Sequence, residues 1–127
     1  MNRRFIAALA VAAVLIFAVF LGQVKLYRTA SDLADRADAI CALLGDERLE
    51  EGQRELTTLF QSFSGKKTFF LFFVNDARFH EILRSLERAC RLVEENDPSP
   101  ALEALSDFSS ALREVSRTHV PTLGNIF

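Results

Sequence analysis

The chain has 127 residues, of which half are hydrophobic, and its formal net charge is −2. This length allows one small domain. Arg3 and Arg4 are the only charged residues before Lys25, so the remaining chain carries 13 basic and 17 acidic residues. This mildly acidic balance provides no basic patch of the kind that nucleic acids require, and we therefore expect no nucleic-acid partner.

The composition favours an all-α fold. The chain has only five glycines and three prolines, which disfavour helices. It is rich in Ala, Leu, Glu and Arg, which favour them. We predict an N-terminal transmembrane helix followed by an antiparallel bundle of about four helices.

The predicted transmembrane helix is an unbroken run of 20 uncharged residues, Phe5 to Val24. At about 1.5 Å per helical residue, such a run spans roughly the 30 Å hydrocarbon core of a bilayer. Positive charge before the first apolar segment stays in the cytoplasm, so Arg3 and Arg4 place the rest of the chain outside. We predict an N-terminal anchor in the cell membrane over residues 1–24 and an extracytoplasmic helical domain over residues 25–127.

A cleaved signal peptide is the alternative for this segment. Its apolar region is usually 7–15 residues long, which is shorter than the run here. The end of the run also lacks small residues at both positions that a signal peptidase reads, because cleavage after Gly22 puts Phe20 at the −3 position. The sequence therefore favours an uncleaved anchor.

The next apolar pattern predicts a helix that can continue directly from the membrane segment. Its stripe has helical spacing and consists of Leu26, Leu33, Ala37, Ile40 and Leu44. Gly45 is a candidate stop residue, and Asp46 is a candidate N-cap for a second helix. The apolar face of the second helix consists of Leu49, Leu56, Leu59, Phe60 and Phe63.

Two further helices are predicted after residue 74. Asn75 or Asp76 is expected to cap the first of them, whose apolar residues are Phe79, Ile82, Leu83, Leu86, Cys90 and Val93. The turn residues 96–98 end this helix. The last helix starts near Ser99 and carries an apolar stripe of Leu102, Leu105, Phe108, Leu112 and Val115. Pro121 ends or kinks it, and the apolar tail 123–127 is expected to fold back onto the bundle.

The run Phe69–Val74 is six consecutive apolar residues, and its spacing alone does not assign it. It is compatible with the buried end of a long second helix, with a short strand, or with a segment that dips into the membrane surface beside Lys66 and Lys67. An apolar patch rimmed by charge suits an interface. We predict contact residues here, with burial in the core as the alternative: Lys66, Lys67, Phe69, Phe70, Phe72 and Phe73.

Cys41 and Cys90 are the only cysteines, and each lies beside apolar residues of its helix. Outside the cytoplasm they can form one disulfide that links the first and third helices. The alternative is that both are small buried core residues with free thiols. No CxxC pair occurs, so the cysteines do not predict a zinc site.

No catalytic or cofactor-binding residue is predicted. Asp76 and His80 are one helical turn apart, and a solvated polar face is their simplest interpretation. His119, near Pro121, is expected to be partly packed or to cap the last turn. The carboxylates of the second helix lie side by side on one surface, whereas a glycosidase needs two that face each other across a cleft. The sequence contains no nucleophile elbow, HExxH motif, P-loop or dinucleotide fingerprint.

The chain resembles an uncharacterised bacterial family, grouped as domain of unknown function number four-three-six-three. The resemblance lies in the basic N-terminus with one membrane segment, in residues 79–86, and in the ending from Thr122 to Phe127. The family often has Trp in its second helix and His at the start of its third. Here phenylalanines occupy the second helix and Asn75 and Asp76 the start of the third. The resemblance implies small, single-pass, membrane-anchored helical proteins and carries no activity.

From these features we expect a membrane-tethered extracytoplasmic helical protein that acts by binding or as a scaffold, and not as an enzyme. Residues 5–24 contact the membrane, and the expected protein partner is another envelope protein. The alternative function is a sensor or carrier of small molecules, with an apolar pocket between the helices.

Overall fold

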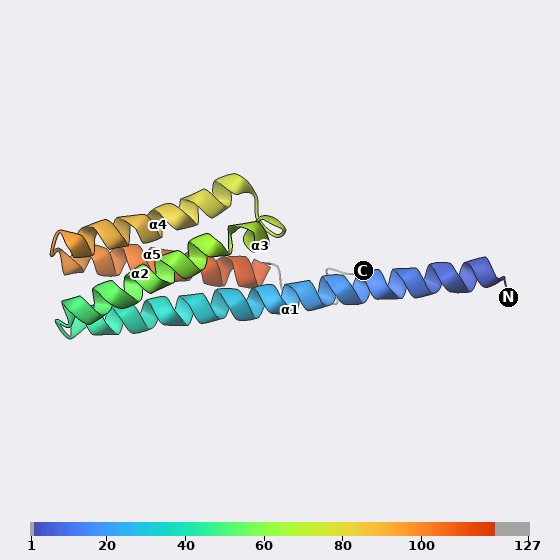
Figure 1. The fold of residues 1–127 in the computed structure, drawn as a ribbon, viewed down its shortest axis with the longest axis horizontal. Coiled ribbons are helices and arrows are strands. Elements are labelled where there is room, and N and C mark those ends of the chain that lie inside the picture. Colours follow the sequence, from blue (N-terminus) through green and yellow to red (C-terminus); the bar gives the residue numbers. More distant parts are fainter. Residues whose placement is uncertain (1, 119–127) are drawn as a thin grey trace.

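The computed structural model describes residues 2–118 and contains five helices within them (Figure 1). Their bounds are Arg3–Gly45 for α1, Leu49–Gly65 for α2, Lys67–Leu71 for α3, Asp76–Glu94 for α4 and Pro98–Thr118 for α5. No strand occurs among these residues, so the prediction of an all-α fold is confirmed.

Helix α1 is a single helix of 43 residues with two different surroundings. The Asn2 side chain caps its start by accepting a hydrogen bond of 3.2 Å from the backbone N–H of Arg4. The N-terminal half projects beyond the other four helices, and the C-terminal half packs in the bundle (Figure 1). The helix has no break at the predicted boundary between residues 24 and 25, so no linker separates the apolar segment from the bundle.

The bundle consists of the C-terminal half of α1 together with α2, α4 and α5. Helix α1 packs against α2 and α5, and α4 packs against the same two helices. Helices α1 and α4 therefore lie diagonally across the core from each other. The short α3 packs on α2 and α4 at the end of the bundle that adjoins the apolar half of α1 (Figure 1). We call this the membrane-proximal end, after the predicted membrane segment.

The core is built from the apolar stripes that the sequence predicts on these four helices. The α1 stripe is entirely buried from Leu26 to Leu44. Small residues on both α1 and α5 are fully buried: Ala30, Ala34 and Ala37 on α1, and Ala101 and Ala104 on α5. Small buried side chains let helix axes approach each other, and α1 and α5 pack extensively.

The turn between α1 and α2 differs from the prediction that Asp46 begins the second helix. The turn residue is Glu47, which has a left-handed φ of 61°. The Arg48 N–H donates to the Leu43 carbonyl at 3.0 Å, and the Glu47 N–H donates to Leu44 at 3.2 Å, which together form a Schellman cap. These hydrogen bonds assign residues 46–48 to the end of α1, and α2 starts only at Leu49.

The predicted start and end of α4 are confirmed. The Asn75 side chain accepts a hydrogen bond of 2.7 Å from the Arg78 N–H at the start of the helix. At its end Asn96 takes a φ of 56°, and the Asp97 N–H donates to the Leu92 carbonyl at 2.9 Å. This is a second Schellman cap, and asparagine tolerates its left-handed position well. The predictions for His119, Pro121 and the tail 123–127 lie outside the described residues.

Candidate membrane-proximal interface

The first half of the apolar run after α2 belongs to a separate helix, α3, and does not extend α2. Helix α2 ends at Gly65, and Lys66 caps it with φ −98° and ψ 13°. The same lysine precedes α3, whose five residues end at Leu71. Residues 72–75 then lead into α4. The strand alternative for this run is wrong, and the alternative of one long second helix fails because the chain turns at Lys66.

Phe70 belongs to the core and not to the surface. Its exposed fraction is 1%, and its ring centroid lies 5.3 Å from that of Phe63 on α2. Phe63 also stacks on Phe79 of α4 at 4.9 Å and meets Phe108 of α5 edge-on at 5.2 Å. These four rings join α2, α3, α4 and α5, and aromatic pairs at such distances stabilise a core beyond simple area burial.

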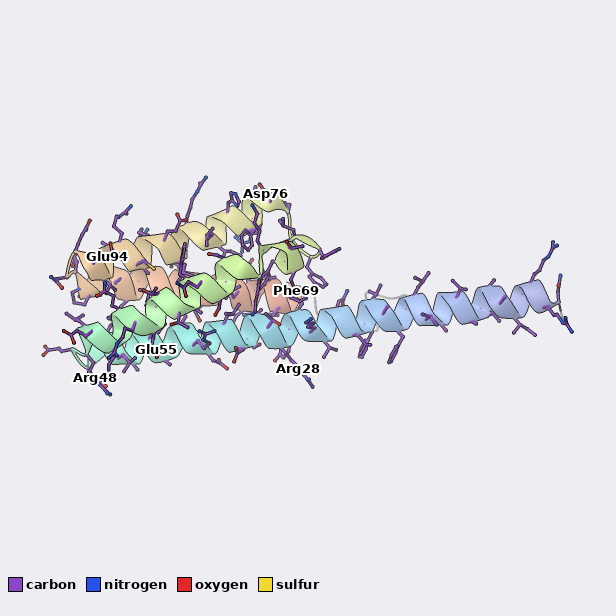
Figure 2. The ribbon with its side chains drawn as sticks, viewed as in Figure 1. Arg28, Arg48, Glu55, Phe69, Asp76 and Glu94 are labelled. Atoms are coloured by element: carbon purple, nitrogen blue, oxygen red, sulfur yellow. The ribbon has the colours of Figure 1, made fainter. Side chains whose placement is uncertain are left out.

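Phe72 lies on the opposite side of the run and is 81% exposed. Leu71 beside it is also exposed. Phe69 and Phe73 are half-buried, and their ring centroids are 5.3 Å apart (Figure 2 labels Phe69). The six predicted contact residues therefore differ in burial. Phe70 lies in the core, and Phe72 is exposed to contact another surface.

The half-buried rings touch α1 where the apolar segment meets the bundle. A Cβ atom placed on Gly22 would lie 3.6 Å from Cζ of Phe73, an ordinary van der Waals distance, so the ring lies beside α1 at this position. Nζ of Lys25 lies 5.4 Å from the centroid of the Phe69 ring, within the range of a cation–π contact. Helix α3 thus has an electrostatic contact with α1 through Phe69, and the loop after it has a packing contact with α1 through Phe73.

The polar residues near α3 are exposed and weakly paired. Nζ of Lys67 lies 4.0 Å from a carboxylate oxygen of Asp76, and Nε2 of His80 lies 4.0 Å from the other oxygen. Lys66 is also exposed. No group of three or more metal-ligating side chains occurs within residues 2–118.

A polar network that the sequence did not reveal links α1 and α5. Ser109 is 2% exposed, and its hydroxyl donates to a carboxylate oxygen of Asp38 at 3.0 Å. The Arg113 guanidinium donates to the other Asp38 oxygen at 2.6 Å and to Asp35 at 3.1 Å. These hydrogen bonds raise the pKa of Arg113 above its usual value, mainly through Asp38. The spacing of Asp35 and Asp38 on one helix and of Ser109 and Arg113 on another is the only trace in the sequence.

Cys41 and Cys90 are both free thiols, and both are only half-buried. They lie on α1 and α4, which are diagonal to each other in the bundle. Neither sequence interpretation fits fully, because the thiols are unbonded and neither is fully inside the core. Burial raises the pKa of Cys90 to about 11, and the nearby Glu94 and Glu87 add to this effect. Burial and then Asp38 raise the pKa of Cys41 in the same direction.

The surface also has open hollows beside α2. One lies between α1 and α2 and is rimmed by Arg36, Glu51, Arg54 and Glu55. Another lies between α2 and α4 and includes Phe60 and Cys90, with Glu87, Arg91 and Glu94 around them. Charged side chains rim both hollows, and the first is also lined by Ala39, Ile40 and Leu43.

A comparison with models of protein families found a match that covers most of the chain. The model of a family described as a domain of unknown function, DUF4363, matches residues 20–126. The chain belongs to this family. The match begins inside the apolar segment, so the DUF4363 region includes the junction of α1 with the bundle. No curated protein and no solved structure matches the chain.

Proposed function

We propose that this DUF4363 protein is a membrane-tethered helical scaffold outside the cytoplasm, where its bundle binds another envelope protein. The observation that carries the proposal is α1, which runs without a break from an unburied apolar segment into the bundle, where it is one of the four packed helices. A continuous helix fixes the orientation of the bundle relative to the membrane segment. This suits a scaffold that presents its binding surface at a fixed distance from the membrane.

The apolar half of α1 supports the tether. It is long and apolar enough to cross a membrane, and its most apolar stretch makes no buried contact with the described chain. A signal sequence passes the same test of length and composition. The tether is favoured here because a helix that is apolar on all sides, and whose most apolar stretch is unburied among the described residues, needs a lipid environment. Arg3 and Arg4 before it favour a cytoplasmic N-terminus.

Binding is favoured over chemistry by the way in which the bundle is filled. Four phenylalanine rings occupy the space between α2, α3, α4 and α5, where a ligand pocket would need to lie. The hollows at the surface are open and lined by both charged and apolar side chains, a mixture that suits a protein surface better than an enclosed apolar small molecule.

The test combines fractionation with affinity capture from membranes. The tagged chain is expected to stay with the membrane after alkaline extraction and to recover a defined envelope protein. The matched control is Phe63→Asp, which puts a charge into the core and leaves the apolar half of α1 unchanged. It is expected to remain in the membrane and to lose the partner. A soluble wild-type chain, or the same recovered proteins from both baits, would contradict the proposal.

A further inference from the structure

The loop that follows α3 lies beside the predicted membrane segment. A shallow hollow there is lined by Ala18, Val19, Gly22 and Gln23 from α1, and by Phe72 and Phe73 from the loop. The Phe73 ring lies beside Gly22, which places the loop next to this part of α1. Apolar side chains of the bundle therefore continue the apolar surface of α1 sideways.

The position of this hollow along α1 sets its depth in a membrane. Val19 and Gly22 belong to the uncharged run that ends at Val24. With a rise of about 1.5 Å per residue, Val19 lies about 8 Å inside the end of that run. If the run spans the bilayer, Phe72 and Phe73 lie at the boundary between acyl chains and headgroups, where aromatic rings are enriched.

Exposure separates this loop from the rest of the bundle. Phe72 is 81% exposed and Leu71 is 38% exposed. After Lys25 the other exposed large hydrophobic residue among the described ones is Tyr27, which lies one turn above the apolar run on α1. All three are near the membrane-proximal end, whereas the far end of the bundle carries charged exposed residues such as Arg48 and Glu94 (Figure 2).

Basic residues also gather at the membrane-proximal end. Lys25 and Arg28 follow the apolar run on α1, Lys66 precedes α3 and Lys67 begins it; all four are exposed. Flexible basic side chains just outside an apolar segment can reach lipid phosphates, and each contributes to attraction by an anionic surface. The arrangement has the two components of an interfacial membrane site, which are apolar side chains below and positive charge above.

We propose that Leu71, Phe72 and Phe73 insert into the outer leaflet of the membrane that α1 crosses, with the neighbouring lysines and arginine at anionic headgroups. This proposal rests on the tether proposed above and assigns lipid as the partner of the exposed loop. Lipid is favoured over a protein because the loop is level with the last residues of the apolar run and continuous with its surface. The bundle then has two membrane contacts, which fix its tilt and leave its outer faces for the envelope partner.

The chain contains no tryptophan, so one substitution introduces a unique fluorophore. The Phe72→Trp variant and a control, Glu94→Trp at the far end of the bundle, are reconstituted as full chains into phosphatidylcholine vesicles with and without phosphatidylglycerol. Lipids brominated at shallow or deep acyl positions serve as quenchers. The Phe72→Trp emission is expected to be blue-shifted and lost most strongly with shallow bromines, and the Glu94→Trp emission to be unaffected.

Three results would overturn the proposal. Solvent-like, unquenched emission from Phe72→Trp would mean that the loop lies in water. Blue-shifted emission without quenching would mean that protein, either residues 119–127 or another chain, covers position 72. Loss of the envelope partner from Phe72→Ser in the affinity capture, with the protein still folded, would assign the loop to that partner. Each of these results leaves the tether intact, whereas failure of the chain to enter vesicles would contradict the tether itself.

Discussion

The two halves of α1 have the same backbone structure and opposite surroundings. From Phe5 to Leu21 the large apolar side chains are about half exposed or more, whereas from Leu26 to Leu44 a stripe of them is buried. The difference lies in the arrangement of polar residues. The first half is apolar on every face, and the second places aspartates and arginines between the stripe positions. Both halves form helix because of local residue preferences. The arrangement of polar side chains determines which surroundings each half suits.

The largest effect is expected inside the bundle, at the ring cluster. Phe63→Ala removes the ring that contacts Phe70, Phe79 and Phe108. We expect it to lower the free energy of unfolding by about 3–5 kcal/mol, because it leaves a cavity in the core. Denaturant unfolding in detergent, followed by circular dichroism, measures this loss. The control Phe72→Ala is expected to change it by less than about 0.5 kcal/mol. Equal losses from both variants would remove the distinction between core and surface phenylalanines.

A charge in the first half of α1 is expected to weaken insertion into the membrane without changing the stability of the bundle. Val14 is exposed near the middle of the apolar run. An arginine at such a position costs roughly 2.5–3.5 kcal/mol of insertion free energy. Val14→Arg is therefore expected to reduce the fraction that resists alkaline extraction and to leave the unfolding of the bundle unchanged. The matched control is Ala42→Arg, at an exposed position of the second half. Normal membrane insertion of Val14→Arg would contradict the assignment of this half to lipid.

A smaller effect is expected at the polar network between α1 and α5. Ser109→Ala deletes the buried hydroxyl that donates to Asp38. We expect a loss of about 1 kcal/mol in the free energy of unfolding. The neighbouring Ser110 is exposed, so Ser110→Ala controls for the change in helix preference. If the two variants unfold at the same denaturant concentration, the network does not stabilise the packing of α1 on α5.

The smallest effect concerns the pH dependence of Cys90. Its pKa is raised from 9.0 to about 11, so the folded thiol ionises at higher pH than the unfolded thiol. The rate of alkylation by iodoacetamide in a Cys41→Ser background is expected to rise toward pH 11 when folded and around pH 9.0 in urea. The same difference should lower stability as the pH rises from 9.0 toward 11, because only the unfolded state gains from ionisation there. A folded profile centred near 9.0 would show that the burial of Cys90 does not affect its thiol.

The sequence predicted the long elements well because their patterns repeat. The stripe from Leu26 to Leu44 and the cap at Asn75 each have a local cause that spacing reveals. The turn at Glu47 was missed because a glutamate in a left-handed conformation has no sequence signature comparable to glycine. The Schellman cap is defined by local backbone hydrogen bonds, and no glycine or asparagine marks its left-handed position in the sequence.

The candidate interface was predicted only as a segment. Six consecutive apolar residues have no periodicity, so nothing in their order distinguishes Phe70 from Phe72. The distinction arises from α2 ending at Gly65, which rotates the next turn so that one ring enters the core. The Ser109–Asp38–Arg113 network could not be predicted from the sequence, because Asp38 lies 71 positions from Ser109 and 75 positions from Arg113.

The most direct test of the account is the topology of α1. In a background with Cys41→Ser and Cys90→Ser, single cysteines are introduced as Asn2→Cys at the start of α1 and Ser110→Cys on the exposed face of α5. Intact cells are then treated with a membrane-impermeant maleimide. We predict that Ser110→Cys is labelled in intact cells and that Asn2→Cys is labelled only after the membrane is permeabilised. Labelling of Asn2→Cys from outside, or protection of Ser110→Cys, would contradict a helix that crosses the membrane and carries the bundle on its outer side.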